Sequence, residues 1–233
     1  MTNLDHWGNR SKDFLLPHFE NAEYIVKIAS GFFTVKGFNI FINALEGKKT
    51  LILVGYDENQ NKNLIGKLLA DVKEDLKRWD HLNRYAAVRL LIAKLVKREI
   101  YFRENDDNPY ADARIRKDDH GKVYIIDDKI VFTGSINSTY RGLVQNEESS
   151  AGINEPERVI KWIIWFKERW EDPNTQDLTR LLLELLSAWI TFVTPFDIYL
   201  KSIGILVPEE DPIPPRADYK LPANYQKVIE GCA

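Results

Sequence analysis

The sequence predicts a layered α/β domain, and three observations indicate it. The chain has 233 residues, of which 44% are hydrophobic, so it can bury a large core. Apolar runs typical of strands alternate with segments of helical periodicity, as in a sheet that is covered by helices. Two further apolar runs, residues 122–126 and 129–133, flank a pair of aspartates and predict a β-hairpin.

The first half of the chain supplies the alternating elements. Residues 25–33 (IVKIASGFF) are rich in β-branched and aromatic side chains and predict a buried strand. Residues 37–45 have helical spacing and are followed by Gly47 as a stop signal. Residues 51–55 (LILVG) are wholly apolar, which is typical of a strand covered on both faces. Residues 63–83 predict a charged amphipathic helix.

The second half begins with a basic segment and ends in a tail. Residues 84–117 carry nine basic side chains against five acidic ones, a local net charge of +4. A solvated surface and a phosphate-contacting surface explain this excess equally well. From residue 155 to residue 201 the spacing of the large aromatic residues is helical and predicts core packing of Trp162, Trp165, Phe166, Trp170 and Trp189. The proline-rich, charged tail from residue 207 predicts a linker or a domain edge.

Composition excludes several classes of protein. The formal net charge of −3 excludes a histone-like or polybasic protein, so a nucleic-acid site must be a local patch. Cys232 is the only cysteine, which excludes an intrachain disulfide and a cysteine-cluster zinc site. The longest stretch without a charged residue has 12 residues, short of the roughly 18 that span a bilayer, and the first residues do not form a secretory signal. We expect a cytoplasmic protein with no membrane partner.

The predicted hairpin brings polar side chains together. If the aspartate pair is a two-residue loop, His120 lies opposite Ser135 and Lys122 lies opposite Thr133. Because side chains alternate along a strand, His120, Lys122, Ser135 and Asn137 then project from one face. Such a polar set is poor core material and predicts an anion site.

These residue types suit phosphodiester chemistry. A neutral imidazole is a nucleophile for phosphorus, and a carboxylate on its other nitrogen fixes the tautomer. Lysine and asparagine donors stabilise the charge that develops on the phosphoryl oxygens. None of these steps requires a metal ion or another cofactor, and we expect none.

The spacing of these residues carries a resemblance to a known family. The pattern is His120-x-Lys122-x4-Asp127, followed by Gly134-Ser135-x-Asn137. It resembles the HKD motif of the phospholipase D (PLD) superfamily, and Glu148 stands where that family has a downstream carboxylate, with Glu147 as the second choice. Membership implies a PLD-like α/β/α sandwich with a mixed β-sheet, followed here by C-terminal helices, and a covalent phosphohistidine intermediate.

The resemblance implies a role for each matching residue. The expected catalytic set is His120, Lys122, Ser135, Asn137 and Glu148. Asp127 has opposite strand parity to His120 and sits at the turn, so we expect it, with Gly134, to be structural rather than reactive. A set of flanking basic residues is expected either to guide a phosphate backbone or to be solvated: Arg114, Arg116, Lys117 and Arg141.

The resemblance extends beyond the motif. Residues 28–55 are similar to the first strand–helix–strand unit of the PLD-like domain that precedes bacterial SNF-type helicases. Residues 221–233 are similar to the segment that opens a helicase motor. The implied division is a PLD-like catalytic domain at 1–154, a helical extension packed on it at 155–206, and a linker with the start of a helicase motor at 207–233.

The superfamily's active site normally uses two HKD motifs, and this sequence has one. The residues two positions after His6, His18 and His81 are glycine, glutamate and asparagine instead of lysine. Single-motif nucleases of the family pair two identical chains, so that one histidine attacks and the other protonates the leaving group. The resemblance and this count together imply a homodimer through the HKD face.

Three functions are compatible with these residues. The leading one is a metal-independent phosphodiesterase that acts on DNA, the nuclease module of a helicase-linked restriction or defence protein. The second is a DNA-binding and dimerisation module of such a helicase, with a catalytically silent site. The third is a lipid phosphodiesterase, and the lack of an interfacial amphipathic helix or a lipid-anchor motif counts against it.

Overall fold

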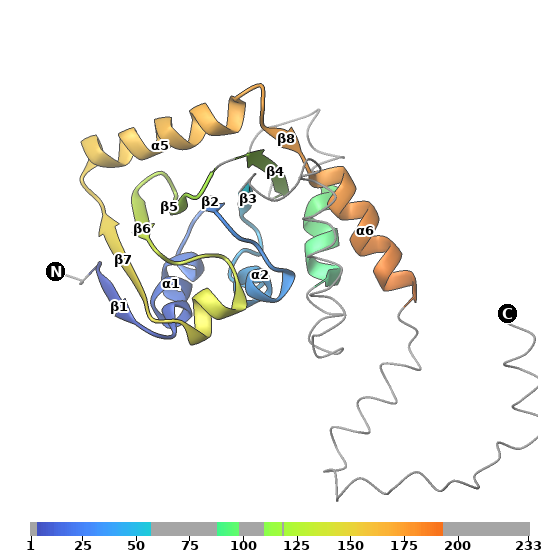
Figure 1. Cartoon of the computed structure of the whole chain (residues 1–233), viewed down its shortest axis with the longest axis horizontal. Helices are drawn as coiled ribbons and strands as arrows, with labels where there is room; N and C mark the ends of the chain where they lie inside the picture. Colours follow the sequence, from blue (N-terminus) through green and yellow to red (C-terminus); the bar gives the residue numbers. More distant parts are fainter. Residues whose placement is uncertain (1–3, 57–87, 98–109, 118, 193–233) are drawn as a thin grey trace, which may run out of the picture. The chain divides into compact units, whose positions relative to one another are not determined.

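A computed structural model of the chain describes residues 4–56, 88–97, 110–117 and 119–192. Within these ranges the chain forms an eight-stranded sheet with helices on both faces (Figure 1). The strand order is β1-β7-β6-β5-β2-β3-β4-β8. Neighbours β2, β3 and β4 run parallel, whereas the other neighbours are antiparallel. The predicted α/β fold with a mixed sheet is therefore confirmed.

The elements follow one another in the order that Figure 1 shows. The strands are β1 (His6–Gly8), β2 (Ile25–Ser30), β3 (Lys49–Tyr56), β4 (Ala111–Lys117), β5 (Lys122–Ile126), β6 (Ile130–Gly134), β7 (Glu148–Ile153) and β8 (Gln176–Asp177). The helices are α1 (Ser11–Glu20), α2 (Val35–Ile42), α5 (Pro156–Glu171) and α6 (Thr179–Phe192), together with a π-helical turn η2 (Arg141–Gln145). Residues 88–97 are also helical.

The unit β2–α2–β3 matches the strand–helix–strand pattern of the sequence. The strand β2 ends at Ser30, three residues before the predicted end. The helix α2 begins after Thr34, whose hydroxyl oxygen accepts a hydrogen bond from the backbone N–H of Gly37 at 3.0 Å. The parallel pairing of β2 with β3 requires such a crossover helix.

Alternate residues of the central strands bury two separate clusters. On one face, Val26 and Ile28 pack with α1 and α2. On the other face, Ala29 and Leu53 pack with α5, where Phe166 is buried. The predicted core role of the aromatic residues of α5 holds for this face, since three further side chains are partly buried against the same cluster: Trp162, Trp165 and Trp170. The side chain of Trp189 lies outside the described residues.

The predicted register of the hairpin is wrong by one residue. The structure pairs Ile126 with Ile130 and Val123 with Thr133, so Lys122 does not face Thr133. The loop has three residues, because Lys129 is added to the aspartate pair. Both aspartates have left-handed backbone angles, with φ of 51° and 53°, and the Lys129 N–H closes the turn on the oxygen of Ile126 at 2.9 Å.

The corrected register also changes what lies opposite His120. This residue precedes β5, and Ser135 follows β6, so neither belongs to the paired part of the hairpin. The N–H of Ser135 instead bonds to the oxygen of Ser149 at 2.8 Å. The predicted facing of His120 and Ser135 is therefore wrong as well, because the third loop residue moves every cross-strand partner along the hairpin by one position.

Several predictions fall on parts of the chain that lie outside the described residues. They are the helix at 63–83, most of the basic segment, the tail from residue 207 and the segment similar to a helicase motor. The described residues all belong to one compact unit, Met1–Thr194. The division at residues 154 and 206 stays a prediction. No helix among the described residues is long and apolar enough to cross a membrane.

Lys94, in the helical residues 88–97, has a buried ammonium group. The residue is 8% exposed, and Nζ donates hydrogen bonds to the backbone oxygens of Leu45 at 2.6 Å and Lys48 at 3.0 Å. The loss of hydration on burial lowers the pKa of Lys94 from 10.5 to about 8.

This lowered pKa predicts that stability depends on pH. Between pH 8 and 10.5 the unfolded chain keeps a proton that the folded protein releases, so the free energy of unfolding rises with pH in this window. The full shift corresponds to about 3 kcal/mol at roughly 1.4 kcal/mol per pKa unit. Urea unfolding of the wild type and Lys94→Met between pH 7 and 10 checks this. The wild type should gain stability relative to Lys94→Met as the pH rises; a constant difference would contradict the prediction.

Candidate active site

The candidate site lies where β2 ends and β5 begins. Ser30, the last residue of β2, pairs with Lys122, the first residue of β5. Gly31 follows directly after the end of β2 and lies close to His120. A Cβ atom at Gly31 would lie 3.3 Å from Cα and 3.5 Å from Nδ1 of His120. The glycine therefore allows the exposed histidine to rest against the end of β2.

The side chain of Asn137 also lies close to Gly31, on which His120 rests. Its Oδ1 atom would also lie 3.5 Å from a Cβ atom at Gly31. The same oxygen accepts a hydrogen bond from the N–H of Phe32 at 3.2 Å. Because this bond uses the carbonyl end of the amide, the NH₂ end is the donor that remains for a phosphate oxygen.

Two buried hydroxyl groups fix the loop that carries Asn137. Ser30 Oγ accepts a bond from the N–H of Ser138 at 2.8 Å and donates one to the oxygen of Phe32 at 2.6 Å. The hydroxyl of Tyr124 donates to the oxygen of Ile136 at 3.1 Å. Burial, with a smaller contribution from Glu148, raises the pKa of Tyr124. The phenol therefore stays protonated, and the donor that anchors this loop is present at every physiological pH.

Lys122 stands beside the histidine on the strand. Its Nζ donates a hydrogen bond to the backbone oxygen of His120 at 2.8 Å. The residue shares strand parity with Tyr124, so it lies on the α1–α2 face of the sheet. His120, Lys122 and Asn137 are thus brought together around the end of β2.

Ser135 and Glu148 form a second polar group at the junction of β6 and β7. The Ser135 hydroxyl donates to Oε2 of Glu148, and Oε1 of the same carboxylate accepts from Nδ2 of Asn146 at 3.2 Å. Gly134 lets the strands meet here, since a Cβ atom would lie 2.0 Å from the oxygen of Ser149. The hydrogen bonds found for Glu148 run to these neighbours, and its expected bond to a histidine stays a prediction.

The segment before His120 is held from two sides. A Cβ atom at Gly55, in β3, would lie 1.4 Å from the oxygen of Asp119, so only glycine fits. The Asp119 carboxylate accepts the N–H of Gly121 at 2.8 Å and forms an ion pair with Arg169 of α5 at 3.2 Å. The sequence analysis did not single out Gly31, Gly55 and Asp119. For the two glycines a signal was available, because a glycine in an apolar strand often marks a close approach of another backbone segment.

Asp127 lies at the far end of the hairpin. It lies five positions after Lys122, roughly 17 Å along a strand. Its buried carboxylate accepts backbone N–H bonds from Glu23 at 2.7 Å, Tyr24 at 3.0 Å and Ile25 at 3.1 Å. This geometry joins the turn to the start of β2.

The four flanking basic residues lie in different environments. Arg114 donates to the oxygen of Trp170 at 2.8 Å, and Arg116 forms an ion pair with Asp172 at 2.7 Å, so both contact the C-terminal end of α5. Lys117 and Arg141 are exposed. A role of these residues in binding a phosphate backbone stays a prediction. Among the described residues, no group of three or more His, Cys, Asp or Glu side chains is placed to hold a metal ion.

Comparison with known proteins identifies a matching family. A family model described as "Cardiolipin synthase, PLD-like domain" matches residues 15–170. No curated protein matches the sequence. Among solved structures, the phospholipase D family member Nuc from Salmonella typhimurium is 18% identical, with a TM-score of 0.45, and the match covers 74% of this chain and 96% of that chain.

Two further solved structures are similar to a comparable degree. NucT from Helicobacter pylori is 20% identical, with a TM-score of 0.43, over 74% of this chain and 96% of that chain. Phosphatidylserine synthase from Haemophilus influenzae Rd KW20 is 14% identical, with a TM-score of 0.47, over 87% of this chain and 46% of that chain.

Proposed function

This chain belongs to the family of PLD-like domains, and from that membership we propose that it is a metal-independent phosphodiesterase that cleaves DNA. The observation that carries the proposal is that His120 and Asn137 both lie close to Gly31, with Lys122 beside His120. An exposed imidazole next to an ammonium group and an amide donor suits attack on a phosphodiester.

The chemistry follows from these groups. A ring nitrogen of His120 forms a bond to phosphorus while the bond from phosphorus to the leaving oxygen breaks. Lys122 and the NH₂ group of Asn137 stabilise the charge on the non-bridging oxygens. A general acid protonates the leaving oxygen, and water then hydrolyses the phosphohistidine to restore the imidazole.

The general acid in this proposal is His120 of a second copy. The other two described histidines support this assignment, because His6 and His18 both pack against Phe14 of α1, with ring centroids 5.1 and 5.7 Å from it. Those rings belong to the cluster beneath α1 and not to the end of β2. A two-fold homodimer through the HKD face would supply the missing imidazole.

DNA is the proposed substrate because the surroundings of the site suit bases as well as phosphates. Phe32, directly after Gly31, is 54% exposed and offers an aromatic surface for a base. The exposed guanidinium of Arg141 follows the loop that carries Asn137 and suits a neighbouring phosphate. The sequence similarity of residues 221–233 to a helicase motor supports a nuclease module that works with such a motor.

The proposal is tested by hydrolysis in excess EDTA. The protein is expected to cleave single-stranded DNA and bis-p-nitrophenyl phosphate with EDTA present. Lys122→Met should lower kcat/KM by about 30- to 1000-fold, or roughly 2–4 kcal/mol, because a preorganised cation is lost. Lys129→Met is the matched control, because Lys129 lies at the other end of the hairpin. Its exposed Nζ forms a surface ion pair with Glu23 at 2.8 Å. Activity that needs Mg²⁺ and survives Lys122→Met would overturn the proposal and favour a silent DNA-binding module.

A further inference from the structure

The short segment that carries His120 is held by the helix α5 as well as by the sheet. The side chain of Asp119 is 5% exposed, and its carboxylate forms an ion pair with Arg169 of α5, with Oδ2 3.2 Å from Nε. The guanidinium of Arg169 lies over the ring of Trp165, with 4.1 Å between its central carbon and the ring centre. A buried carboxylate is costly without an opposite charge, so this pairing favours one position of Asp119.

The same carboxylate closes a turn around His120. Its Oδ1 atom accepts the backbone N–H of Gly121 at 2.8 Å, so the side chain of Asp119 bonds to the backbone two residues later and encloses His120. Such a turn restricts the backbone angles of the enclosed residue. Trp165 lies against this turn, since a Cβ atom at Gly121 would lie 2.7 Å from the Trp165 ring and 2.9 Å from Oδ1 of Asp119. The backbone of His120 therefore has little freedom.

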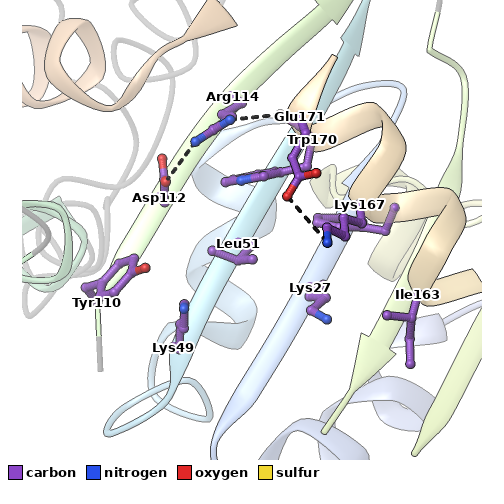
Figure 2. A pocket seen from close by; sticks show the side chains of 11 residues that line it. Lys27, Lys49, Leu51, Tyr110, Asp112, Arg114, Ile163, Lys167, Trp170 and Glu171 are labelled. Carbon is purple, nitrogen blue, oxygen red and sulfur yellow. Dashed lines mark hydrogen bonds and ion pairs between the residues drawn. The ribbon is translucent and has the colours of Figure 1, made fainter. Parts of the chain in front are cut away.

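The helix that supplies Arg169 and Trp165 is itself anchored to the sheet. Figure 2 shows Arg114 reaching from β4 to the end of α5 beside Trp170. Arg114 donates a hydrogen bond to the backbone oxygen of Trp170 at 2.8 Å, and its guanidinium lies 4.4 Å from the centre of the Trp170 ring. Because Arg169 directly precedes Trp170, this contact fixes the part of α5 that holds Asp119.

Such a hold matters most for a side chain that is not packed. His120 is exposed, so the direction of its imidazole depends mainly on its backbone. Attack on phosphorus requires an aligned ring nitrogen, and a displacement of about 1 Å can cost on the order of a hundredfold in rate. We propose that Asp119 is a positioning residue for the nucleophile and that Arg169 holds it in place. This inference rests on the proposed phosphodiesterase function, and Asp119 acts through the backbone of His120 and not on the substrate.

Hydrolysis of bis-p-nitrophenyl phosphate by Asp119 variants tests this role. Asp119→Ala is expected to lower kcat per folded molecule about 10- to 100-fold and to change KM by less than about threefold, because Lys122 and Asn137 still bind the substrate. Asp119→Asn should recover most of this loss, since its amide oxygen can still accept the N–H of Gly121. Circular dichroism of each variant gives the folded fraction by which the rates are corrected.

A double-mutant cycle tests whether Arg169 acts through Asp119. Arg169→Met alone should lower kcat about tenfold, because it leaves the buried carboxylate without its counter-charge, and it should have no further effect in Asp119→Ala. Lys167→Met is the matched control, because Lys167 lies on the same helix and its exposed ammonium forms an ion pair with Glu171 at 3.9 Å. This control should hydrolyse the diester as the wild type does. Additive losses in the double variant would overturn the role of Arg169.

A measurement without substrate separates this inference from the proposed function. The backbone amide of His120 is expected to have an NMR order parameter of about 0.85 in the wild type, as in a rigid backbone, and below about 0.6 in Asp119→Ala. An active wild type with an unchanged kcat in Asp119→Ala, or an unchanged order parameter in that variant, would overturn the positioning role. A wild type that does not hydrolyse the diester would overturn the proposed function instead, and the order parameter would still show whether Asp119 holds His120.

Discussion

Replacing His120 with alanine is expected to reduce phosphodiester hydrolysis by a factor on the order of 10⁴ or more, because the covalent route has no other nucleophile. The folded structure should persist, since the side chain of His120 is exposed and lies beside Gly31 at the end of β2. Steady-state rates with DNA and with bis-p-nitrophenyl phosphate measure the loss. His6→Ala is the control, because that partly exposed ring lies in the cluster with Phe14.

The same variant also tests the shared active site. If one site needs His120 from both chains, an equimolar mixture of wild type and His120→Ala, allowed to exchange subunits, should retain about a quarter of the wild-type activity. If each chain acts alone, about half should remain. Labelling with a phosphodiester, stopped with an alkaline denaturant, should place an alkali-stable, acid-labile phosphate on His120. Full activity of His120→Ala would contradict the assignment of His120 as the nucleophile. A mixture that retains half of the wild-type activity would contradict an active site shared by two chains.

Replacing Asp127 with alanine is expected to lower the free energy of unfolding by about 3–5 kcal/mol while leaving the chemistry intact. The change removes the acceptor of three backbone N–H groups at the start of β2, and buried donors without partners are costly. Urea unfolding measures the loss. The rate per folded molecule, measured at low temperature, should change by less than about threefold, because Asp127 lies roughly 17 Å along the strand from Lys122.

Asp128→Ala is the matched control for this experiment. Asp128 is the neighbouring residue of the same turn, and its carboxylate forms an ion pair with Lys27 at 2.6 Å. Its side chain is 33% exposed, so removal should cost only about 1 kcal/mol. An Asp127→Ala protein that is as stable as the wild type but inactive would show that the third residue of the HKD motif takes part in the reaction.

The fold class could be predicted from local pattern because each element of the α/β unit is coded within a short segment. The apolar run of β2, the helical spacing of α2 and the apolar run of β3 follow one another without a break. Hydrophobic periodicity reports which face of an element is buried, and parallel strands with a crossover helix have few other arrangements. The aromatic residues of α5 were assigned to the core by the same reasoning.

The residue types of the candidate site and their spacing could be predicted from the sequence, since His120, Lys122 and Asn137 lie in one strand–turn–strand segment. The positions of these side chains relative to one another depend on tertiary contacts. Asp127 binds the backbone of residues about a hundred positions earlier, and Lys129 adds a third residue to the loop, which shifts the pairing by one. Gly31 and Gly55 are needed because His120 and Asp119, which lie between β4 and β5, approach them closely. Such contacts join segments far apart in the chain, and they depend on packing that no local periodicity encodes.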